Sequence, residues 1–414
     1  MELREGLPVR NEVKAGYKNT EVGVIPEDWE VKFLSQLGEN LIGLTYSPKD
    51  VKEYGHLVLR SSNIQNNKLA FENNVFVEME LPQRVIVKEN DILICVRNGS
   101  KNLIGKCALI DKKTEGSAFG AFMSVYRTDY SNYIFHQFQS NIIQKQIDEV
   151  MGATINQLTN KDLATFQIPL PPTKTEQTCI ATVLSDADAL INSLEKLIAK
   201  KRNIKQGAMQ KLLQPNPDSY REGWEVKKLG EIGECIIGLT YTPENVKESG
   251  TLVLRSSNVQ NNILKYEDNV YVDSKIPEKL ITRENDILIC VRNGSRNLIG
   301  KCALLNGRAI GETFGAFMSV YRSEFNGFVF LLFQSEIIKR QIDEHLGATI
   351  NQITNKSLNS FEIPFPSIEE QTRIATILSD MDAEIQALET KLEKYRKIKL
   401  GMMQNLLTGK IRLV

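Results

Sequence analysis

The feature that most constrains the fold of this 414-residue chain is an internal repeat. The segment LVLRSSN at residues 57–63 returns at 252–258, and DILICVRNGS at 91–100 returns at 286–295, a constant separation of 195 residues (252 − 57 = 286 − 91 = 195). Solenoid repeats are only about 20 to 50 residues long. A period this long is that of a whole domain. We therefore expect two copies of one domain, suited to a target with two similar halves.

Composition places the chain among ordinary soluble globular proteins, with 42% hydrophobic and 25% charged residues. No apolar run approaches the roughly 18 residues that cross a bilayer, and the opening MELREGLPVRNEVK lacks the apolar core of a secretory signal. We therefore expect a cytoplasmic location. The formal net charge is zero, so nucleic-acid binding would need a local basic surface balanced by acidic residues elsewhere.

Each copy opens with WEVK and continues as short apolar runs separated by Gly, Asn, Pro and Ser. The runs are rich in β-branched and aromatic residues, which predicts strands, and the apolar spacing over 135–151 predicts one helix. The fold class is therefore α+β, with two near-identical α/β domains. We place the boundaries at 1–28 for a lead-in segment, 29–172 for the first domain, 173–214 for a central long helix, 215–366 for a linker and the second domain, and 367–414 for a C-terminal long helix.

Two long helices are predicted to follow the two domains. Thr173-x-x-Glu176 and Ser367-x-x-Glu370 have the capping-box pattern, in which the hydroxyl accepts from the backbone and the Glu reaches back to the cap. A 3-4 apolar spacing then runs for about 30 residues in each helix, and such a seam needs a partner helix. The seam positions are Leu184, Ala187, Ile191, Leu194, Ile198, Lys201, Lys205, Ala208 and Leu212 in the first helix, and Leu378, Met381, Ile385, Leu388, Leu392, Tyr395, Lys399, Met402 and Leu406 in the second.

The nearest partner for each seam is the other helix of the same chain. The linker at 215–221 is short, so the second domain starts at the far end of the first helix. We therefore predict an antiparallel coiled coil and a dumbbell with a pseudo-two-fold axis. Gly207 and Gly401 occupy matching interior positions, where Gly costs about 1 kcal/mol relative to Ala. This hints at a close backbone approach, although simple tolerance fits nearly as well.

The repeat also tests for catalysis, because a duplicated active site should keep its residues. The three histidines do not recur: His56, His136 and His345 correspond to Thr251, Leu331 and Val150. Gly99 to Lys106 resembles a phosphate loop, but it has five residues between its glycines and lacks the hydroxyl residue that would hold Mg²⁺. We expect no catalytic, cofactor-binding or metal site in this chain.

Four of the six cysteines recur between the copies, Cys95 with Cys290 and Cys107 with Cys302. No CxxC spacing is present, which argues against a zinc ribbon or a redox pair. Cys95 lies inside the apolar run DILICV, so we interpret it as a small buried hydrophobic residue.

Polar and basic turns between the strands are the features that both copies share. Arg and Lys suit guanine and phosphate, Asn and Gln suit adenine, and Ser and Thr suit phosphate. Ordinary turn chemistry explains Asn-Gly-Ser equally well, but a turn does not require basic side chains. The candidate DNA-binding residues are Thr45, Tyr46, Arg60, Asn63, Arg97, Asn98, Lys101 and Asn102, with Thr240, Tyr241, Arg255, Asn258, Arg292, Asn293, Arg296 and Asn297 in the second copy.

A further polar segment, GATINQLTNK, also recurs in the second copy. Its candidate side chains are Thr154, Asn156, Gln157, Thr159, Asn160 and Lys161, matched by Thr349, Asn351, Gln352, Thr354, Asn355 and Lys356. Among all these positions we favour Arg97 and Lys101 with their counterparts as readers of DNA.

Taken together, the motifs resemble the DNA specificity (S) subunit of type I restriction-modification enzymes. The resemblance rests on GVIPEDWEVKFLSQLGE and GWEVKKLGEIGE at the domain starts, on DILICVRNGSKNLIGKCAL, and on the exits PLPPTKTEQTCIATVLSDAD and PFPSIEEQTRIATILSDMD. The chain also ends in LLTGKIRLV, in the manner of that family. The similarity covers essentially the whole chain, and its parts occur in the same order.

The resemblance implies two target recognition domains, each reading half of a bipartite site in double-stranded DNA, with the helices as a ruler. It implies a non-catalytic subunit that binds two methyltransferase (M) subunits and, in the full complex, restriction (R) subunits. S-adenosylmethionine, ATP and Mg²⁺ would belong to those partners. Many family members carry dissimilar recognition domains. The close similarity of the two copies here predicts a palindromic site instead.

A second reading from another functional class is a tandem protein- or glycan-binding module with a coiled-coil spacer. Retention on DNA that falls steeply with salt would favour DNA recognition over that reading.

Overall fold

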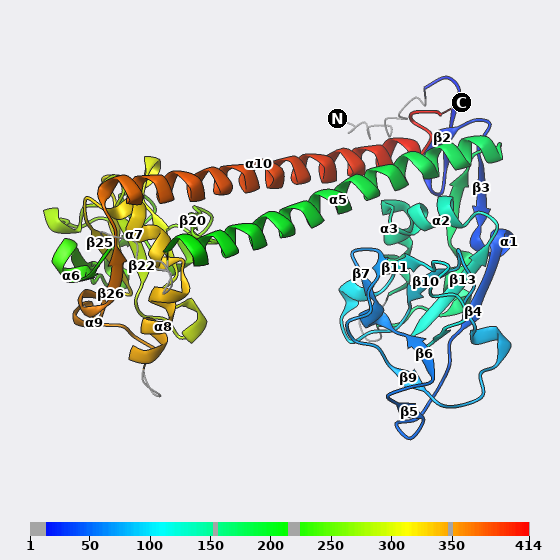
Figure 1. Ribbon diagram of the computed structural model, residues 1–414. Helices are drawn as coiled ribbons and strands as arrows, with labels where there is room; N and C mark the ends of the chain where they lie inside the picture. The colour runs from blue at the N-terminus through cyan, green and yellow to red at the C-terminus, as the bar shows by residue number, and fades with distance from the viewer. Residues whose placement is uncertain (1–13, 152–155, 214–223, 347–350, 414) are drawn as a thin grey trace, which may run out of the picture. The chain divides into compact units, whose positions relative to one another are not determined.

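The computed structural model describes residues 14–151, 156–213, 224–346 and 351–413. The linker at 215–221, Thr154 and Thr349 lie outside the described residues, as does most of the lead-in segment. The chain divides into two compact units, Met1–Glu195 with Lys391–Val414, and Lys196–Thr390. Each unit combines a globular α+β part with portions of two long helices (Figure 1).

The central sheet of the first unit explains why its middle strand is apolar at every position. The sheet is antiparallel, with strand order β11-β10-β13-β4. Side chains alternate along β10: Ile92 and Ile94 enter one hydrophobic core, while Leu93 and Cys95 enter another. Both faces are therefore covered. The strands are β4 (Gly38–Ile42), β10 (Ile92–Cys95), β11 (Cys107–Leu109) and β13 (Met123–Thr128).

A second sheet in the order β12-β6-β9-β5 packs over the second of these cores. Its β12–β6 pair is parallel and its other pairs are antiparallel. A small hairpin, β7–β8, turns through Asn66 and Asn67, which have φ of 50° and 58°, the left-handed region that Asn tolerates. The elements are β5 (Val51–Lys52), β6 (His56–Leu59), β7 (Ile64–Gln65), β8 (Lys68–Leu69), β9 (Phe76–Val77) and β12 (Ala118–Phe119).

Short helices and two-stranded ribbons close the first core. The predicted single helix over 135–151 is wrong, because the segment folds as two helices separated at Gln139 and Ser140. Ser140 has an extended backbone, and its hydroxyl donates to the carbonyl oxygen of Gln137 at 2.7 Å. The elements are β1 (Tyr17–Thr20), β2 (Gly23–Pro26), β3 (Glu30–Phe33), α1 (Leu34–Leu37), α2 (Ser131–Phe138), α3 (Asn141–Val150), α4 (Asn160–Thr165) and β14 (Gln167–Leu170).

The second unit repeats this topology, which confirms the predicted duplication. Its sheets have the orders β16-β25-β22-β23 and β17-β21-β18-β24, matching the first copy strand for strand. Its elements are β15 (Glu225–Lys228), α6 (Leu229–Ile232), β16 (Glu234–Ile237), β17 (Val246–Lys247), β18 (Thr251–Leu254), β19 (Val259–Gln260), β20 (Ile263–Leu264), β21 (Tyr271–Val272), β22 (Ile287–Cys290), β23 (Cys302–Leu304), β24 (Thr313–Phe314), β25 (Met318–Arg322), α7 (Asn326–Phe333), α8 (Glu336–His345), α9 (Asn355–Ser360) and β26 (Glu362–Phe365).

The two predicted long helices are present as α5 (Lys174–Leu213) and α10 (Ile368–Leu406), of 40 and 39 residues. At 1.5 Å per residue, each is about 60 Å long. Among the described residues, no helix has the length and apolar character needed to cross a membrane.

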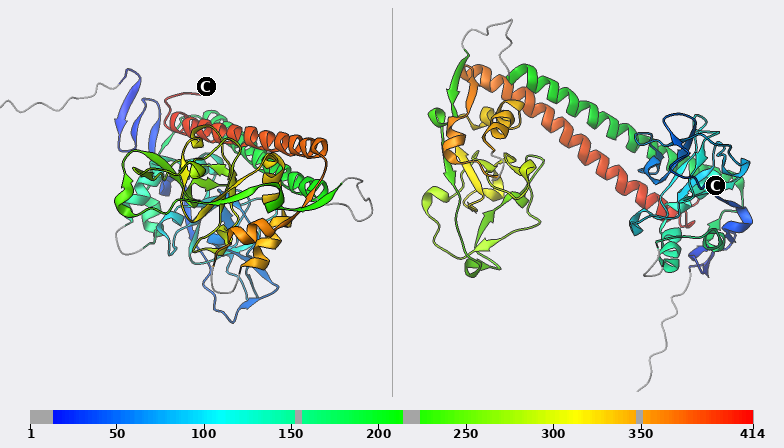
Figure 2. Two further views of the ribbon diagram at one scale, coloured as in Figure 1. Left: turned by 90° about the vertical axis from the view of Figure 1, so that its left-hand side faces the viewer. Right: turned by 90° about the horizontal axis from the view of Figure 1, so that it is seen from below.

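The long helices pair in antiparallel fashion within each unit (Figures 1 and 2). In the first unit, Lys399 bonds Asp188 and Arg396 bonds Glu195, each at 2.6 Å. The partner on α10 moves backward as the position on α5 moves forward, as antiparallel pairing requires.

The second unit has the same arrangement. Lys201 bonds Glu384 at 2.6 Å and Lys205 bonds Asp382 at 2.5 Å. The predicted seam is also confirmed, because Ile191, Ile198 and Ile385, which lie outside the domain cores, are buried. The placement of the two globular parts as a dumbbell and the exact domain boundaries stay predictions.

The structure corrects one detail of the predicted long helices, the first capping box, and decides between the two explanations of their interior glycines. The Thr173 hydroxyl does accept from the Glu176 backbone, at 3.2 Å. The Glu176 carboxylate, however, bonds Arg412 from the C-terminal segment instead of reaching back to the cap. Gly207 and Gly401 are not sites of close backbone approach, because a Cβ at either position would meet nothing within 4 Å.

Candidate nucleic-acid interface

The candidate interface of the first unit is organised around the tight turn between β12 and β13. The Met123 amide donates to the Gly120 carbonyl oxygen at 2.8 Å, which closes the turn. The Gly120 amide donates to Leu59 and the Ala121 amide donates to Leu44, each at 2.9 Å. Leu44 and Leu59 lie directly before Thr45 and Arg60, so this turn brings two candidate segments to one place.

The basic turn after β10 joins the same cluster. The amides of Val96 and Arg97 both donate to the carbonyl oxygen of Phe122 at 3.1 Å. The Asn98 side chain donates to the Ser61 hydroxyl at 3.2 Å, and the Asn156 side chain donates to the Gly99 carbonyl oxygen at 3.0 Å. Four segments that are distant in the sequence therefore meet around the basic turn.

Arg97 differs from the other basic residues of this cluster in what its charged group contacts. Among the described residues it has no carboxylate partner, and its guanidinium lies 5.1 Å from the centre of the Phe122 ring. By contrast, Lys101 faces Asp148 at 3.6 Å, and Arg60 donates to the Asn73 carbonyl oxygen at 3.2 Å. Arg97 therefore has the most freely available guanidinium donors in the cluster.

The second unit reproduces this arrangement closely. The amides of Val291 and Arg292 donate to the Phe317 carbonyl oxygen at 3.0 and 3.1 Å. The Arg292 guanidinium lies 5.0 Å from the centre of the Phe317 ring. The Asn293 side chain donates to the Ser256 hydroxyl at 3.2 Å, as in the first copy. As in the first copy, the second basic residue faces a carboxylate, with Arg296 4.0 Å from Asp343.

Asn63 and Asn258 do not fit the predicted contact with DNA. Both are fully buried, with 0% exposure, and each caps its own turn by accepting from the backbone amide of Arg60 or Arg255, at 3.0 and 2.9 Å. Their amide groups also donate to backbone carbonyl oxygens within the protein. These asparagines hold the turn, and we exclude them from the candidate surface.

The remaining predicted residues lie at intermediate or exposed positions around the cluster. Thr45, Arg97, Lys101 and Asn102 are exposed, as are Thr240, Arg292, Arg296 and Asn297. Tyr46, Arg60 and Asn98 are half-buried, as are Tyr241, Arg255 and Asn293. Tyr46 packs at the edge of the core beneath the cluster, so its ring belongs partly to the domain interior.

Sequence reasoning missed Phe122 and Phe317. Each is 57% exposed, although the residues on the strands beside them are buried. The segment FMSVYR is predicted as a strand, and an apolar residue within a strand is usually part of the core. The small residues just before the ring, Gly120 and Ala121 in the first copy, were the available sign of a turn.

The groups that suggested other chemistry have structural roles. His136 is fully buried, and burial, followed by the nearby Lys399 charge, lowers its pKa to about 4. Gly105 of the apparent phosphate loop has φ of 82°, and a Cβ there would lie 2.5 Å from the Ile147 side chain, so it is a packing glycine. Burial raises the pKa of Cys107 to about 12. Among the described residues, no group of three or more His, Cys, Asp or Glu could hold a metal ion.

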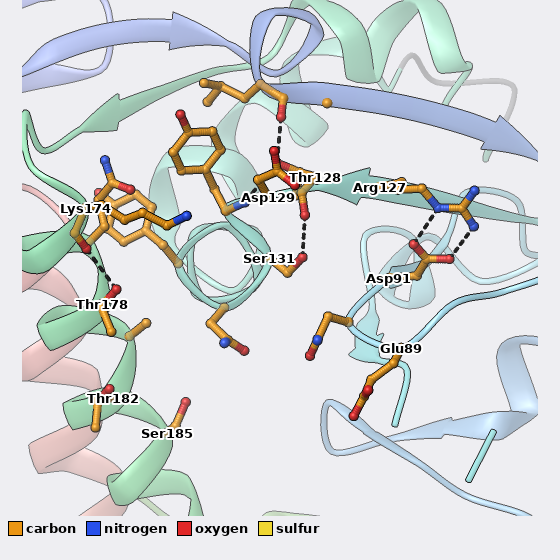
Figure 3. A pocket seen from close by; sticks show the side chains of 18 of the residues that line it. Glu89, Asp91, Arg127, Thr128, Asp129, Ser131, Lys174, Thr178, Thr182 and Ser185 are labelled. Carbon is orange, nitrogen blue, oxygen red and sulfur yellow. Dashed lines mark hydrogen bonds and ion pairs between the residues drawn. The ribbon is translucent and has the colours of Figure 1, made fainter. Parts of the chain in front are cut away.

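A separate polar cavity of about 880 Å³ lies in the first unit, between the start of α2 and the first turns of α5 (Figure 3). Arg127 bonds Asp91 at 2.7 Å in its wall, and Ser131 donates to the Thr128 carbonyl oxygen at the same distance. Its lining includes no histidine or cysteine. The Ser185 hydroxyl, which also lines the cavity, lies 3.1 Å from Nε2 of the buried His136. Leu331 replaces that histidine in the second copy, so this pair is not duplicated.

Comparison with known proteins identifies a family that this chain matches. The sequence model of the "type I restriction modification DNA specificity domain" matches residues 26–206 and 221–396. The chain is 32% identical over 428 residues to a putative type I restriction enzyme MjaX specificity subunit of Methanocaldococcus jannaschii, covering 96% of each chain. It is 28% identical over 306 residues to the type I restriction enzyme EcoKI specificity subunit of Escherichia coli, covering 68% of this chain and 65% of that one.

Two solved structures have a similar fold. One is a chain of a type I restriction-modification system, with a TM-score of 0.60, 16% identity, and coverage of 94% of this chain and 99% of that one. The other is the S subunit of such a system from M. genitalium, with a TM-score of 0.58, 17% identity, and coverage of 91% and 96%. At this level of identity the likeness concerns the fold alone.

Proposed function

Since the chain belongs to the family of type I restriction-modification DNA specificity subunits and carries two of its recognition domains, we propose that each domain reads one half of a bipartite DNA site and that the two half-sites form an inverted repeat. The reading surface in each domain is the cluster of turns around Arg97 or Arg292. The two long helices set the spacing of the half-sites.

The observation that carries this proposal is the near identity of the two turn clusters. The side chains at the exposed positions are the same in both copies except at Lys101, which corresponds to Arg296, and both are basic. The hydrogen bonds that position the basic turn also recur, within about 0.1 Å. Two surfaces with the same donors in the same geometry select the same bases.

Besides the difference between Lys101 and Arg296, the copies also differ at positions outside this cluster. Lys68 corresponds to Ile263, and Lys112-Lys113-Thr114 corresponds to Gly307-Arg308-Ala309. The exposed basic side chains among them, Lys112, Lys113 and Arg308, would adjust phosphate contacts more than base contacts, because phosphates are bound by charge without regard to sequence.

The proposed role is non-catalytic. The chain would act in the cytoplasm with two methyltransferase subunits and, in the full complex, restriction subunits. S-adenosylmethionine, ATP and Mg²⁺ would be bound by those partners and not by this chain. The exposed faces of α5 and α10 are the proposed docking surfaces, and the ion pairs between the helices support a stiff spacer.

The complex reconstituted with its methyltransferase subunit tests this proposal. Sequences bound from a random library, or methylated in a genome that carries the complex, should contain inverted half-sites around a spacer of fixed length. Unrelated half-sites or one continuous site would refute the palindrome. Absence of any sequence preference in the intact complex would refute DNA recognition, and the protein- or glycan-binding reading would replace it.

A paired substitution locates the reading surface. Arg97→Ala with Arg292→Ala should relax the preference at one matching position in each half-site, at a cost of about 1–3 kcal/mol per bidentate contact. Lys52→Ala with Lys247→Ala is the matched control, since both lysines are exposed and lie outside the cluster. A uniform loss of affinity across all sequences would mean that the arginines contact phosphate.

A further inference from the structure

The paired arginine and phenylalanine in each domain carry an inference about which bases are read. An exposed phenylalanine is unremarkable by itself, but here the same ring is 57% exposed in both copies. Other exposed aromatic residues of the first copy have changed, since Tyr54 corresponds to Ser249 and Phe71 to Tyr266. The Phe122 position is therefore one where both copies retain the same apolar ring amid polar turns.

The backbone holds each ring firmly in place. The Phe122 carbonyl oxygen accepts two amide hydrogens, from Val96 and Arg97, and the next residue, Met123, is 1% exposed in the core. The ring is thus anchored by its own backbone on one side and by a core residue on the other. Such a ring is presented to a ligand without a loss of loop entropy on binding.

The position of the guanidinium decides how the ring can contact DNA. Arg97 covers one face of Phe122, at 5.1 Å from the ring centre, and Arg292 covers Phe317 at 5.0 Å. A wedge inserted between base pairs needs its faces free for stacking on the bases. A ring with one face covered presents its edge and its other face, which suits a contact in the groove.

We propose that Phe122 and Phe317 each contact the 5-methyl group of a thymine that adjoins the guanine bound by Arg97 or Arg292. A planar guanidinium donates two hydrogen bonds to the O6 and N7 atoms of guanine in the major groove, where the thymine methyl group is the one apolar feature. The cation–π contact restrains the guanidinium over the ring, so one pair reads two neighbouring bases. This inference rests on the proposed function.

Replacement of thymine by deoxyuridine tests the contact, because it removes only the methyl group. The reconstituted complex is tested on its own target duplex. Replacing one thymine beside a guanine in a single half-site should lower affinity about three- to five-fold, from the burial of one methyl group. The variant Phe122→Ala with Phe317→Ala should bind more weakly and show no further loss on that replacement. Phe122→Leu with Phe317→Leu should retain part of the methyl effect.

Phe33→Ala is the matched control, because Phe33 is 41% exposed on β3, which belongs to a different sheet from β10 and β13. It should leave both the affinity and the methyl effect unchanged. Retention of the methyltransferase subunit on each variant shows that the chain has folded.

The outcomes separate the two proposals. Specific binding by the wild-type complex with no loss at any thymine, or a target without a thymine beside a guanine, would overturn the thymine contact alone. If 2-aminopurine fluorescence shows an unstacked base in the wild-type complex, and the Phe122 variant loses binding, the ring acts as a wedge between bases. That result would also overturn the thymine contact. Absence of specific binding by the wild-type complex would overturn the proposed function.

Discussion

Replacement of His136 by leucine should make the first unit more resistant to acid. His136 lies on α2 with 0% exposure, and its Nε2 atom is 3.1 Å from the Ser185 hydroxyl of α5. The second copy has Leu331 at this place, also buried at 5% exposure. The change His136→Leu therefore installs a side chain that the same fold already accommodates.

The magnitude follows from the pKa of this imidazole. Burial, followed by the Lys399 charge, lowers the pKa of His136 from its ordinary 6.5 to about 4. Between these values the unfolded chain binds a proton that the folded chain does not, so acid favours unfolding. The free energy of unfolding is unaffected above pH 6.5 and falls as the pH drops, by about 2 kcal/mol at pH 5 and about 3 kcal/mol at pH 4.

Urea unfolding followed by tryptophan fluorescence measures this loss. The chain has two tryptophans, and Trp29 lies in the core of the first unit. A Trp224→Phe background therefore makes the signal specific for that unit. Other groups titrate in both proteins, so the relevant quantity is the stability of His136→Leu minus that of the parent at each pH.

This difference should rise by about 3 kcal/mol between pH 7.5 and pH 4. His56→Thr, which copies Thr251, removes an exposed imidazole and should give no comparable rise. A difference for His136→Leu that stays flat within about 0.5 kcal/mol across that range would refute the assignment of a neutral, buried imidazole.

Three substitutions and one measurement of thiol reactivity test the packing. Gly207→Ala and Gly401→Ala should each stabilise the chain by about 0.5–1 kcal/mol in urea unfolding, because both positions are helical and have open space around a Cβ. No gain in stability would contradict the open space at these positions. Asp91→Ala should cost about 2 kcal/mol, because the half-buried Arg127 loses its carboxylate and the Lys88 amide loses its acceptor, and a cost below about 1 kcal/mol would contradict this. Cys107 should resist Ellman's reagent at pH 8 until urea unfolds the protein, since burial raises its pKa to about 12; rapid reaction in the folded chain would contradict it.

Much of the fold was readable because its signals are periodic and duplicated. The strand β10 was predicted from an apolar run, and the long helices were predicted from a heptad seam that proved to be buried. The prediction of a single helix over 135–151 was wrong because Gln139 and Ser140 are not residues, such as Pro or Gly, that mark the end of a helix in the sequence. The break there depends on hydrogen bonds such as that of the Ser140 hydroxyl to Gln137.

The candidate site was only partly readable for a related reason. Arg97 was singled out because a turn does not require a basic side chain, and the structure gives it no carboxylate partner among the described residues. Asn63 was misjudged, because a polar residue in a turn can bond inward as readily as outward, and only its neighbours decide which. Phe122 was missed because, from the sequence alone, a phenylalanine within an apolar segment is expected to be buried, and only the structure shows that its ring is exposed.

The sequence by itself determined that this protein has two like domains and two long helices with matching apolar seams, because repetition and periodicity are properties of the linear sequence. Only the tertiary structure decided which turns meet around Phe122, which polar side chains they bury, and that Glu176 bonds Arg412 from the far end of the chain. Those outcomes depend on contacts between residues far apart in sequence. Such contacts form only when the sheets and helices pack, and no local pattern encodes them.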